Sequence, residues 1–288
     1  MASMKPLKTA FELLAGATRA TPPKLRYGFA RAAGSTWYFA SPQQRRSAHS
    51  NYAAALRLPP RSREVRRVAR RAFQNYVCML ADFALIASLK PEELQSHVSV
   101  QGLQHLDALR TGDLGGILAV PHMASWDMGA SVAGVLGYNL AAVVDRFPGS
   151  LNEAVIEKRR GFGLTVIPLG AMAARQIAVV LRGGGLVALA CDLPQGPGVE
   201  VNFFTRRATV PTGPASLALR TGAALLTAYT RWNSPGHYHV HVDPPISLPL
   251  TGDARRDIAA LMQAVVDRFE LYISARPSEW FAFRPLFR

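Results

Sequence analysis

A histidine and an aspartate with the spacing of a proton-transfer pair lie near the middle of the chain. They are His122 and Asp127, within the sequence VPHMASWD at residues 120–127. The apolar segment Ile117–Val120 is predicted to be a short buried strand, and Ser125 is a suitable N-cap for the apolar helix that follows. His122 then lies at the carboxyl end of the strand and Asp127 in the first helical turn. We expect Asp127 to hydrogen-bond one ring nitrogen of His122, which leaves the other nitrogen free as a general base.

The pair has a simpler interpretation, because an aspartate near a helix N-terminus is favourable without any catalytic role. The predicted position of His122 favours chemistry, since ligands in open α/β sheets bind at the carboxyl ends of strands. Asp192 is predicted to lie at the same edge, after the apolar strand Leu186–Ala190, and beside the strand of His122 if the strand order allows. Cys191 precedes it, but a buried cysteine at a strand end is more often inert than nucleophilic.

Two further segments suit the binding of phosphate. Arg159 lies at a predicted helix end before Gly161 and Gly163, where cations either bind phosphate or complement the helix dipole. A second helix is predicted to start at residues 212–214. Its free backbone amides either bind a phosphate or an oxyanion or are simply capped. The residues at this helix start are Thr212, Gly213 and Pro214.

Three histidines alternate along one predicted strand, at His237, His239 and His241. Alternation places their rings on one face of the strand with the spacing of metal ligands. Nothing nearby in the sequence completes a metal site, so we expect no metal here. The sequence also lacks a G-x-S-x-G elbow, a P-loop and a G-x-G-x-x-G motif after a strand.

Short apolar strands alternate with helices from about residue 91 onward. The predicted strands are Ile117–Val120, Leu140–Val144, Leu164–Ile167, Leu186–Ala190, Leu225–Thr230 and Tyr238–Val242. The predicted helices are Ser125–Leu136, Leu151–Arg160, Met172–Leu181, Pro214–Arg220 and Ala254–Ser274. This alternation predicts an α/β fold with a mixed, largely parallel sheet flanked by helices.

The first ninety residues are predicted to be helical and basic. The segment Arg61–Leu89 has apolar residues at helical spacing, with arginines at 63, 66, 67, 70 and 71 between them. Such a face is most often only solvated; alternatively it binds anionic lipid, with Trp37, Tyr38 and Phe39 as interfacial anchors. We therefore divide the chain into a basic helical membrane-association region at 1–90 and an α/β catalytic region at 91–288.

The composition narrows the classes of partner. The chain has 288 residues and a formal net charge of +14, which favours partners that carry phosphate, such as lipid headgroups, phosphorylated carriers or nucleic acid. Its two cysteines give no disulfide framework or zinc spacing, so we expect a reducing compartment. No segment is predicted to span a membrane and no signal peptide is evident. We expect a protein that is soluble or peripheral to a membrane.

Several sequence blocks together resemble the lysophospholipid acyltransferase superfamily, and most closely the branch with lipid A biosynthesis and phosphatidylinositol mannoside acyltransferases. The superfamily motif H-x-x-x-x-D is matched by His122 and Asp127, with Trp126 typical of this branch. The R-x-x-x-G block is matched by Arg159 and Gly163. Further similar blocks are the segment 192–204, the P-x-G-P-A-x-L-A block at 211–218, the T-G-A at 221–223 and the P-S-E-W tail at 277–280.

The chain departs from the branch at a few positions beside these blocks. Ala124 and Ser125 stand where many relatives have Gly-Asn, Leu193 stands where a polar residue is common, and Thr205 replaces the glycine of an F-F-G ending. These departures flank the donor and acceptor sites, so they bear on substrate identity more than on reaction class.

The resemblance implies acyl transfer from acyl-CoA or acyl carrier protein to a hydroxyl of a membrane lipid or glycolipid. It implies that His122 is the general base supported by Asp127, and that Arg159, Asp192 and the helix start at 212–214 bind substrates. No metal or other cofactor is required. We expect an anionic membrane surface as partner, no nucleic acid, and a peripheral location on the cytoplasmic side of the cell membrane.

Two alternatives remain open at this stage. The first is an acyl-thioester hydrolase that uses His122 with water in place of the acceptor. The second is a non-catalytic basic protein, binding membrane or nucleic acid, on a degenerate acyltransferase fold. The nucleic-acid version is disfavoured because no stripe of aromatic and basic residues is present on the predicted strands.

Overall fold

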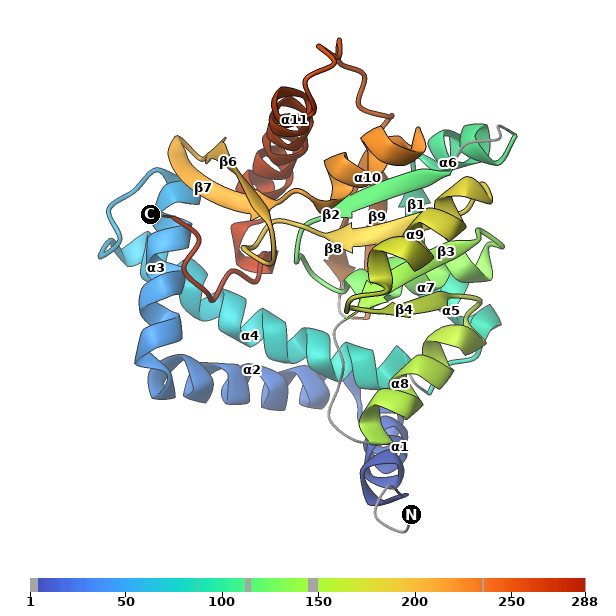
Figure 1. The fold of residues 1–288 in the computed structure, drawn as a ribbon. Helices are drawn as coiled ribbons and strands as arrows, with labels where there is room; N and C mark the ends of the chain where they lie inside the picture. Colours follow the sequence, from blue (N-terminus) through green and yellow to red (C-terminus); the bar gives the residue numbers. More distant parts are fainter. Residues whose placement is uncertain (1–4, 87, 112–114, 145–149, 235, 288) are drawn as a thin grey trace.

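The protein is built around one seven-stranded sheet. The computed structural model describes residues 5–86, 88–111, 115–144, 150–234 and 236–287. The strand order is β1-β9-β8-β2-β5-β3-β4, and every neighbouring pair is parallel except β8 and β9 (Figure 1). The strands are β1 Val98–Gln101, β2 Gly116–Val120, β3 Leu140–Val144, β4 Thr165–Pro168, β5 Leu186–Ala190, β8 Ala224–Ser234 and β9 His237–Val242. The predicted fold class is therefore confirmed.

Helices cover both faces of the sheet because its central strands are apolar on both sides. In β2, Ile117 and Ala119 belong to one hydrophobic core and Leu118 to the other. Residues of α9, α10 and α11 complete the first core, and residues of α5, α6 and α7 complete the second. These helices, with α8 beside β4, are α5 Pro91–His97, α6 Leu103–Arg110, α7 Trp126–Val135, α8 Ser150–Gly161, α9 Ala173–Arg182, α10 Gly213–Thr221 and α11 Ala254–Ala275.

Four helices precede the sheet and lie along one side of it (Figure 1). They are α1 Lys5–Ala20, α2 Pro23–Ala40, α3 Pro42–Leu56 and α4 Arg63–Ile86. The long α4 confirms the predicted helix over Arg61–Leu89 within three residues at each end. Helix α2 lies against α4 at Gly34, where an added Cβ would be 2.5 Å from the Cα of Gln74. Tyr52 and Phe73, from α3 and α4, are fully buried in the same core as α9 to α11.

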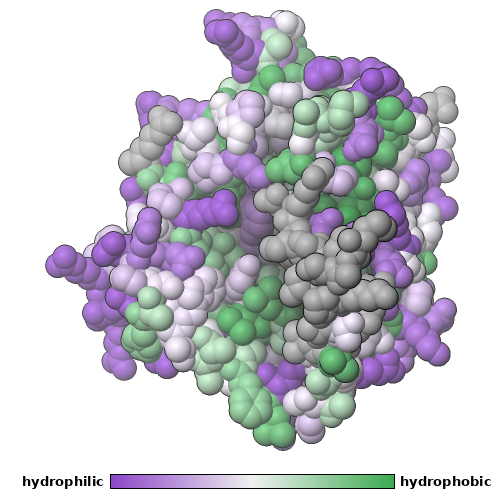
Figure 2. All heavy atoms as spheres, turned by 60° about the horizontal axis from the view of Figure 1, so that its bottom comes forward, coloured by the Kyte–Doolittle hydropathy of each residue, from purple (hydrophilic) through white to green (hydrophobic). Residues whose placement is uncertain are grey.

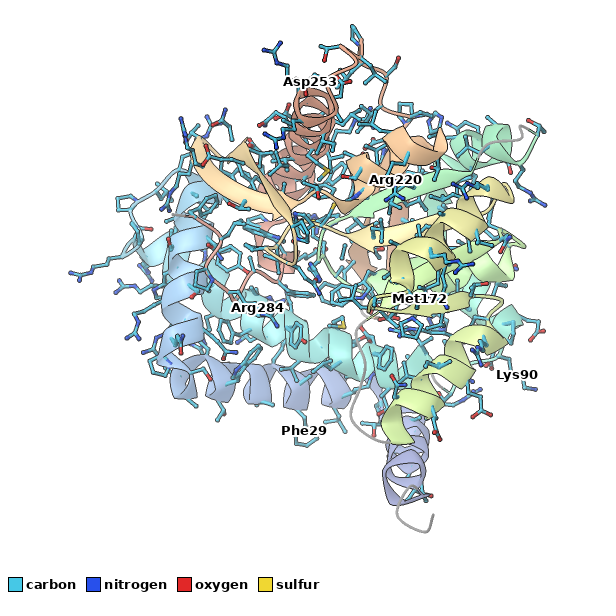
Figure 3. The ribbon with its side chains drawn as sticks, in the orientation of Figure 1. Phe29, Lys90, Met172, Arg220, Asp253 and Arg284 are labelled. Atoms are coloured by element: carbon cyan, nitrogen blue, oxygen red, sulfur yellow. The ribbon has the colours of Figure 1, made fainter. Side chains whose placement is uncertain are left out.

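One face of α2 is exposed to solvent along its length. Leu25, Phe29 and Phe39 are 56%, 73% and 62% exposed, and with Ala32 and Thr36 they recur at three- and four-residue steps. We call these five residues the apolar row of α2. Figure 2 shows hydrophobic side chains on this face of the molecule, and Figure 3 shows Phe29 directed away from the body. The apolar row is thus exposed to solvent, although its composition is typical of a helix face that is buried.

Of the three predicted interfacial anchors, Tyr38 is wrong and Trp37 is half-buried. Tyr38 is 6% exposed, and the Trp37 ring packs 4.4 Å from the Phe73 ring and 5.0 Å from the Phe283 ring, measured between centroids. Only Phe39 is exposed. Three consecutive residues of a helix point in three different directions, and the sequence did not show which of these directions faces solvent.

A buried carboxylate joins these helices to the sheet. Asp82 of α4 is inaccessible to solvent and accepts hydrogen bonds from the hydroxyls of Tyr27 in α2 and Tyr238 in β9. The indole Nε1 of Trp232 in β8 donates a third bond, at 3.3 Å. Burial raises the pKa of Asp82, although these hydrogen bonds oppose the shift. Since a buried polar group without partners is costly, this arrangement fixes α2, α4 and the sheet edge together.

A hairpin and the C-terminal segment complete the fold, and neither was predicted. The hairpin pairs β6 Gly198–Phe203 with β7 Arg206–Pro211, and both of its turn residues, Phe204 and Thr205, have positive φ. Glycine and asparagine are usual in such a turn. The C-terminal segment, drawn in red in Figure 1, starts with a 3₁₀ turn at Pro277–Glu279 and pairs with β7 through Phe287. Strand β1, like β6 and β7, was not predicted from the sequence.

The other predicted elements agree closely with the structure. Five of the six predicted strands match within one residue at each end, and two of these, β3 and β5, have the predicted bounds at both ends. Strand β8 extends four residues beyond the predicted Thr230 because its far end pairs with β9 in an antiparallel ribbon. The predicted N-cap Ser125 precedes α7, but its side chain makes no capping hydrogen bond.

The contact between α7 and the turn after α8 gives a test of the fold. We expect Gly134→Ala to lower the free energy of unfolding by about 1–3 kcal/mol, because the added Cβ would meet the carbonyl oxygen of Phe162 at 2.2 Å. Gly161→Ala is the matched control, since no atom lies within 4 Å of its added Cβ. Urea unfolding of both variants measures the difference. Equal stability of the two would contradict this packing.

Candidate active site

Two neighbouring parallel strands place a histidine beside a buried carboxylate. Val120 of β2 is in register with Ala190 of β5, and two residues later each chain reaches His122 and Asp192. The Nδ1 atom of His122 lies 2.6 Å from Oδ1 of Asp192, whose exposed fraction is 0%. The prediction that Asp192 lies at the carboxyl edge beside the strand of His122 is thereby confirmed.

Backbone contacts fix the loop that carries His122. The amide of Met123 donates to the carbonyl of Pro121 at 2.7 Å, which closes a tight turn around His122. The C-terminal segment then binds the loop on both sides. Phe281 donates its amide to the carbonyl of His122, and Ala124, at a φ of 44°, donates to the carbonyl of Glu279, each at 2.9 Å. The ring orientation of His122 thus depends on a segment far away in the sequence.

The histidine and the aspartate shift each other's protonation. Burial alone would lower the pKa of His122, but attraction to Asp192 and the hydrogen bond to it outweigh burial and raise that pKa. For Asp192, burial alone would raise the pKa, but His122 and the hydrogen bonds that Asp192 accepts lower it. The aspartate therefore remains ionised and stabilises an imidazolium ion when His122 takes up a proton.

The second ring nitrogen of His122 is available for chemistry. The His122 side chain is 29% exposed, and among the described residues none forms a hydrogen bond to Nε2. The Trp126 ring stands edge-on to the imidazole, 5.4 Å away between centroids. A histidine with Nδ1 held by a carboxylate and Nε2 open to a ligand has the geometry of a general base.

Trp280 is a site residue whose role the sequence did not predict. Its indole Nε1 donates to Oδ2 of Asp192 at 2.7 Å, and the ring has an exposed fraction of 0%. The P-S-E-W tail was recognised as a family block, but this contact joins residues 88 positions apart and leaves no local signal. Arg284 of the same segment was also missed, and its positive charge acts to lower the pKa of His122.

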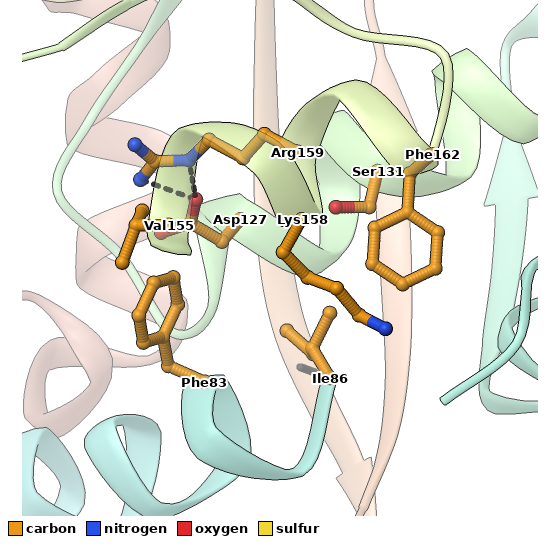
Figure 4. A pocket seen from close by; sticks show the side chains of 8 residues that line it. All are labelled: Phe83, Ile86, Asp127, Ser131, Val155, Lys158, Arg159 and Phe162. Atoms are coloured by element: carbon orange, nitrogen blue, oxygen red, sulfur yellow. Dashed lines mark hydrogen bonds and ion pairs between the residues drawn. The ribbon is translucent and has the colours of Figure 1, made fainter. Parts of the chain in front are cut away.

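The predicted hydrogen bond between Asp127 and His122 is wrong. Asp127 instead accepts two bonds on Oδ1 from Arg159, from Nε at 2.9 Å and from Nη2 at 2.7 Å (Figure 4). Both residues are buried, with exposed fractions of 8% and 7%, so each charge is stabilised by the opposite charge of its partner. The spacing correctly placed Asp127 in the first turn of α7, but that turn faces α8 rather than the loop of His122. Arg159, predicted to bind phosphate, forms an ion pair within the protein.

A small cavity adjoins this ion pair. It measures about 10 Å³, which is about enough for one water molecule and far too small for a fatty acyl chain. Its walls come from α4, α7 and α8, including Phe83, Val155 and Phe162 (Figure 4). The cavity therefore marks imperfect packing around the ion pair rather than a binding site for a chain.

The remaining predicted residues form the start of α10, and among the described residues no hydrogen bond joins them to His122. Thr212 occupies the N-cap position of α10, but its hydroxyl bonds to the carbonyl of Pro197 at 3.4 Å and does not cap the helix. Pro197 belongs to the loop after Asp192, so this helix start adjoins the site loop. Gly213 and Pro214 open the helix, as predicted. Their binding of substrate stays a prediction.

The two other candidate sites from the sequence are Cys191 and the three histidines of β9. Cys191 is 1% exposed, and burial raises the pKa of its thiol well above the ordinary value, so it is not an activated nucleophile. His237, His239 and His241 share one face of β9, as predicted. In the described part of the chain no group of three or more histidine, cysteine or acidic side chains is arranged to hold a metal ion.

The chain is similar to known bacterial proteins over much of its length. The sequence model of the bacterial lipid A biosynthesis acyltransferase family matches residues 12–288. A phosphatidylinositol mannoside acyltransferase of Mycobacterium tuberculosis is 35% identical over 192 residues, 65% of this chain and 58% of the relative. The protein of that name from Mycolicibacterium smegmatis is 31% identical over 199 residues, 67% of this chain and 63% of the relative. The match thus spans about three fifths of these relatives' length.

The contact between His122 and Asp192 predicts a change in pH dependence. A base must be neutral to accept a proton, so wild-type activity falls as the pH falls through the raised pKa of His122. We expect Asp192→Asn to move this acid limb of kcat/KM to lower pH and to reduce kcat by roughly 10²–10⁴-fold. Asp243→Asn is the matched control, since Asp243 contacts His241 at 3.1 Å. An acid limb that stays at the wild-type pH would show that Asp192 does not govern His122.

Proposed function

The chain belongs to the bacterial lipid A biosynthesis acyltransferase family, and on this premise we propose that it is an O-acyltransferase. It moves a fatty acyl chain from acyl-CoA or acyl carrier protein to a hydroxyl group of a membrane glycolipid. The observation that carries the proposal is the pair of His122 and Asp192, which leaves Nε2 of His122 open at the carboxyl end of β2. A degenerate, non-catalytic site has no need for this arrangement.

The proposed reaction needs no covalent enzyme intermediate. Nε2 of His122 takes the proton of the acceptor hydroxyl as the oxygen attacks the thioester carbonyl carbon. The C–S bond of the tetrahedral intermediate then breaks, and the leaving sulfur takes that proton from the imidazolium. Asp192, ionised and buried, stabilises the imidazolium in between. No metal or redox cofactor enters this scheme, because the proton and the acyl group are the only groups transferred.

General base catalysis supplies only part of the rate. It contributes roughly 10²–10⁴-fold, so the binding of both substrates in line with Nε2 must supply much of the remainder. The helix start at Thr212 and Gly213, which adjoins the loop after Asp192, is our candidate for binding a phosphate of the donor or acceptor. Asp127 and Arg159 hold α7 against α8 and act through the position of the loop.

The acceptor class is proposed from the relatives. Both matched proteins are named phosphatidylinositol mannoside acyltransferases, which supports a mannosylated phosphatidylinositol as acceptor. The formal net charge of +14 suits the phosphates of such lipids and of the donor. Because thioester donors are present in the cytoplasm, we place the enzyme on the cytoplasmic face of the membrane.

Acyl transfer is tested by free thiol release from palmitoyl-CoA, with and without phosphatidylinositol mannoside in detergent. We expect release that depends on the acceptor, and a loss of roughly 10²-fold or more in His122→Ala. His105→Ala is the matched control, because His105 lies on α6 and is half-buried outside the site. Mass spectrometry identifies the acylated lipid.

Two results would contradict the proposal. Thiol release without acceptor, lost in His122→Ala, would identify an acyl-thioester hydrolase. No acceptor-dependent release from either palmitoyl-CoA or palmitoyl-acyl carrier protein would favour a non-catalytic protein.

We further propose that the apolar row of α2 contacts the membrane. None of the described helices is both long and apolar enough to cross a bilayer. The charged residues of α2 lie outside the row; they are Lys24, Arg26 and Arg31. Exposed arginines of α4 lie beside it, and the guanidinium of Arg70 stands 5.4 Å from the centre of the Phe39 ring. An apolar helix face flanked by arginines suits the surface of an anionic bilayer.

Binding to vesicles tests this surface. We expect the double variant Phe29→Ser with Phe39→Ser to lower partitioning onto phosphatidylinositol-containing vesicles by roughly tenfold or more, because two large apolar side chains no longer leave water. Leu271→Ser is the matched control, since Leu271 is 70% exposed on α11. Co-sedimentation measures the bound fraction. Equal loss in both variants would exclude a specific role for α2.

A further inference from the structure

We propose that Trp280 is a positioning residue of the acyl-transfer site, whose indole N–H holds the Asp192 carboxylate in the orientation that meets His122. This inference rests on the function proposed above and adds a residue to its machinery. It also gives the N-terminal helices a second role, because they hold the segment that carries Trp280.

The two oxygens of Asp192 have separate partners. Oδ1 lies 2.6 Å from Nδ1 of His122, and Oδ2 accepts the Nε1–H of Trp280 at 2.7 Å. Asp192 and Trp280 each have an exposed fraction of 0%, so solvent does not replace a lost donor without rearrangement of the protein. A carboxylate held at only one oxygen is free to rotate about its Cβ–Cγ bond. The indole removes that freedom and fixes the second oxygen.

Aromatic packing holds the indole ring in place. The centroid of the Trp280 ring lies 5.8 Å from that of Phe203, 6.0 Å from Phe204 and 5.9 Å from Tyr52. Phe203 and Phe204 come from the β6–β7 hairpin and Tyr52 from α3. Rings from α3 and from the β6–β7 hairpin therefore enclose the indole and direct its Nε1–H toward Asp192.

Polar side chains of α3 and α4 hold the backbone of the same segment. The hydroxyl of Tyr52 donates to the carbonyl of Trp280 itself. Nδ2 of Asn51 donates to the carbonyls of Ala282 and Arg284 at 2.9 and 2.8 Å, and Nδ2 of Asn75 donates to the carbonyl of Ser278 at 2.8 Å. Asn51 and Asn75 are 0% and 8% exposed. Buried amides used this way fix the backbone on both sides of Trp280.

The segment is also joined to the loop of His122. The amides of Phe281 and Ala124 bond across to the carbonyls of His122 and Glu279, which places Trp280 opposite Met123 in a β-bridge. Trp280 thus contacts the base by two routes, through the backbone to the His122 loop and through the indole to Asp192. Only the second route depends on the N–H group.

Loss of the indole N–H of Trp280 is expected to shift the pKa of His122 in one direction. The groups whose charges act on His122 are Asp192 and Arg284, and those that act on Asp192 are His122 and the thiol of Cys191. The hydrogen bond from Trp280 helps to lower the pKa of Asp192. Without it the carboxylate is free to turn away from Nδ1 of His122, so its attraction for the imidazolium weakens. The pKa of His122, which only the contact with Asp192 raises against burial, then falls.

The test is Trp280→Phe, which keeps an aromatic ring and removes the N–H. We expect kcat/KM for acyl transfer to fall by roughly 10–100-fold and its acid limb to move to lower pH, in the same direction as in Asp192→Asn. Trp232→Phe is the matched control, because it removes an indole N–H from a different buried carboxylate, Asp82. We expect it to leave the acid limb unchanged.

A measurement without turnover separates this inference from the proposed reaction. The pKa of His122 is read from the NMR titration of its imidazole, assigned by comparison with His122→Gln. We expect it to fall in Trp280→Phe whether or not acyl transfer is detected. If that variant does not fold, 3-benzothienylalanine at this position replaces only the N–H, by sulfur. A pKa of His122 that is unchanged or raised would overturn the positioning role, even with acyl transfer confirmed.

Discussion

The charge of one buried carboxylate determines how the rest of the site is built. Asp192 has no access to water, so its negative charge is stable only while protein groups donate to it. Its two side-chain donors come from the loop after β2 and from the C-terminal segment, 70 and 88 residues away. Both of those segments must therefore be placed before the carboxylate is tolerated. The chemistry and the stability of this region depend on the same two hydrogen bonds.

The N-terminal helices are part of this arrangement rather than an appended region. Residues of α3 and α4 pack in the same hydrophobic core as β2 and Trp280. Asp82 connects α4 with α2 on one side and with β8 and β9 on the other. One helical layer thus presents an apolar row outward at α2 and holds the C-terminal segment inward at α3 and α4. The exposed apolar row of α2 and the imidazole of His122 are thus linked by a short series of buried groups.

The sequence predicted the sheet well and the side-chain partners less well. Strands such as β2 and β5 are buried on both faces, so they form continuous apolar runs with clear ends. Strands β6 and β7 have one exposed face with Glu200 and Arg207, and their turn has Phe204-Thr205 where glycine or asparagine is usual. The partner of Asp127 was mistaken because spacing fixes a position in a helix turn but not what that turn faces. The role of Trp280 was not predicted because its partner Asp192 is 88 residues away in the sequence and is adjacent only in the folded protein.

The attachment of the C-terminal segment to the His122 loop has a consequence for synthesis of the protein. Chains emerge from the ribosome with their N-terminal parts first, and folding begins there. The strands that place His122 and Asp192 are complete long before residue 280 emerges, yet until then the carboxylate lacks its second donor and the loop lacks its backbone partners. A nascent chain that stops before residue 280 therefore has the strands of the site but not the contacts that orient His122 and Asp192. The site is assembled only after this late segment has been synthesised.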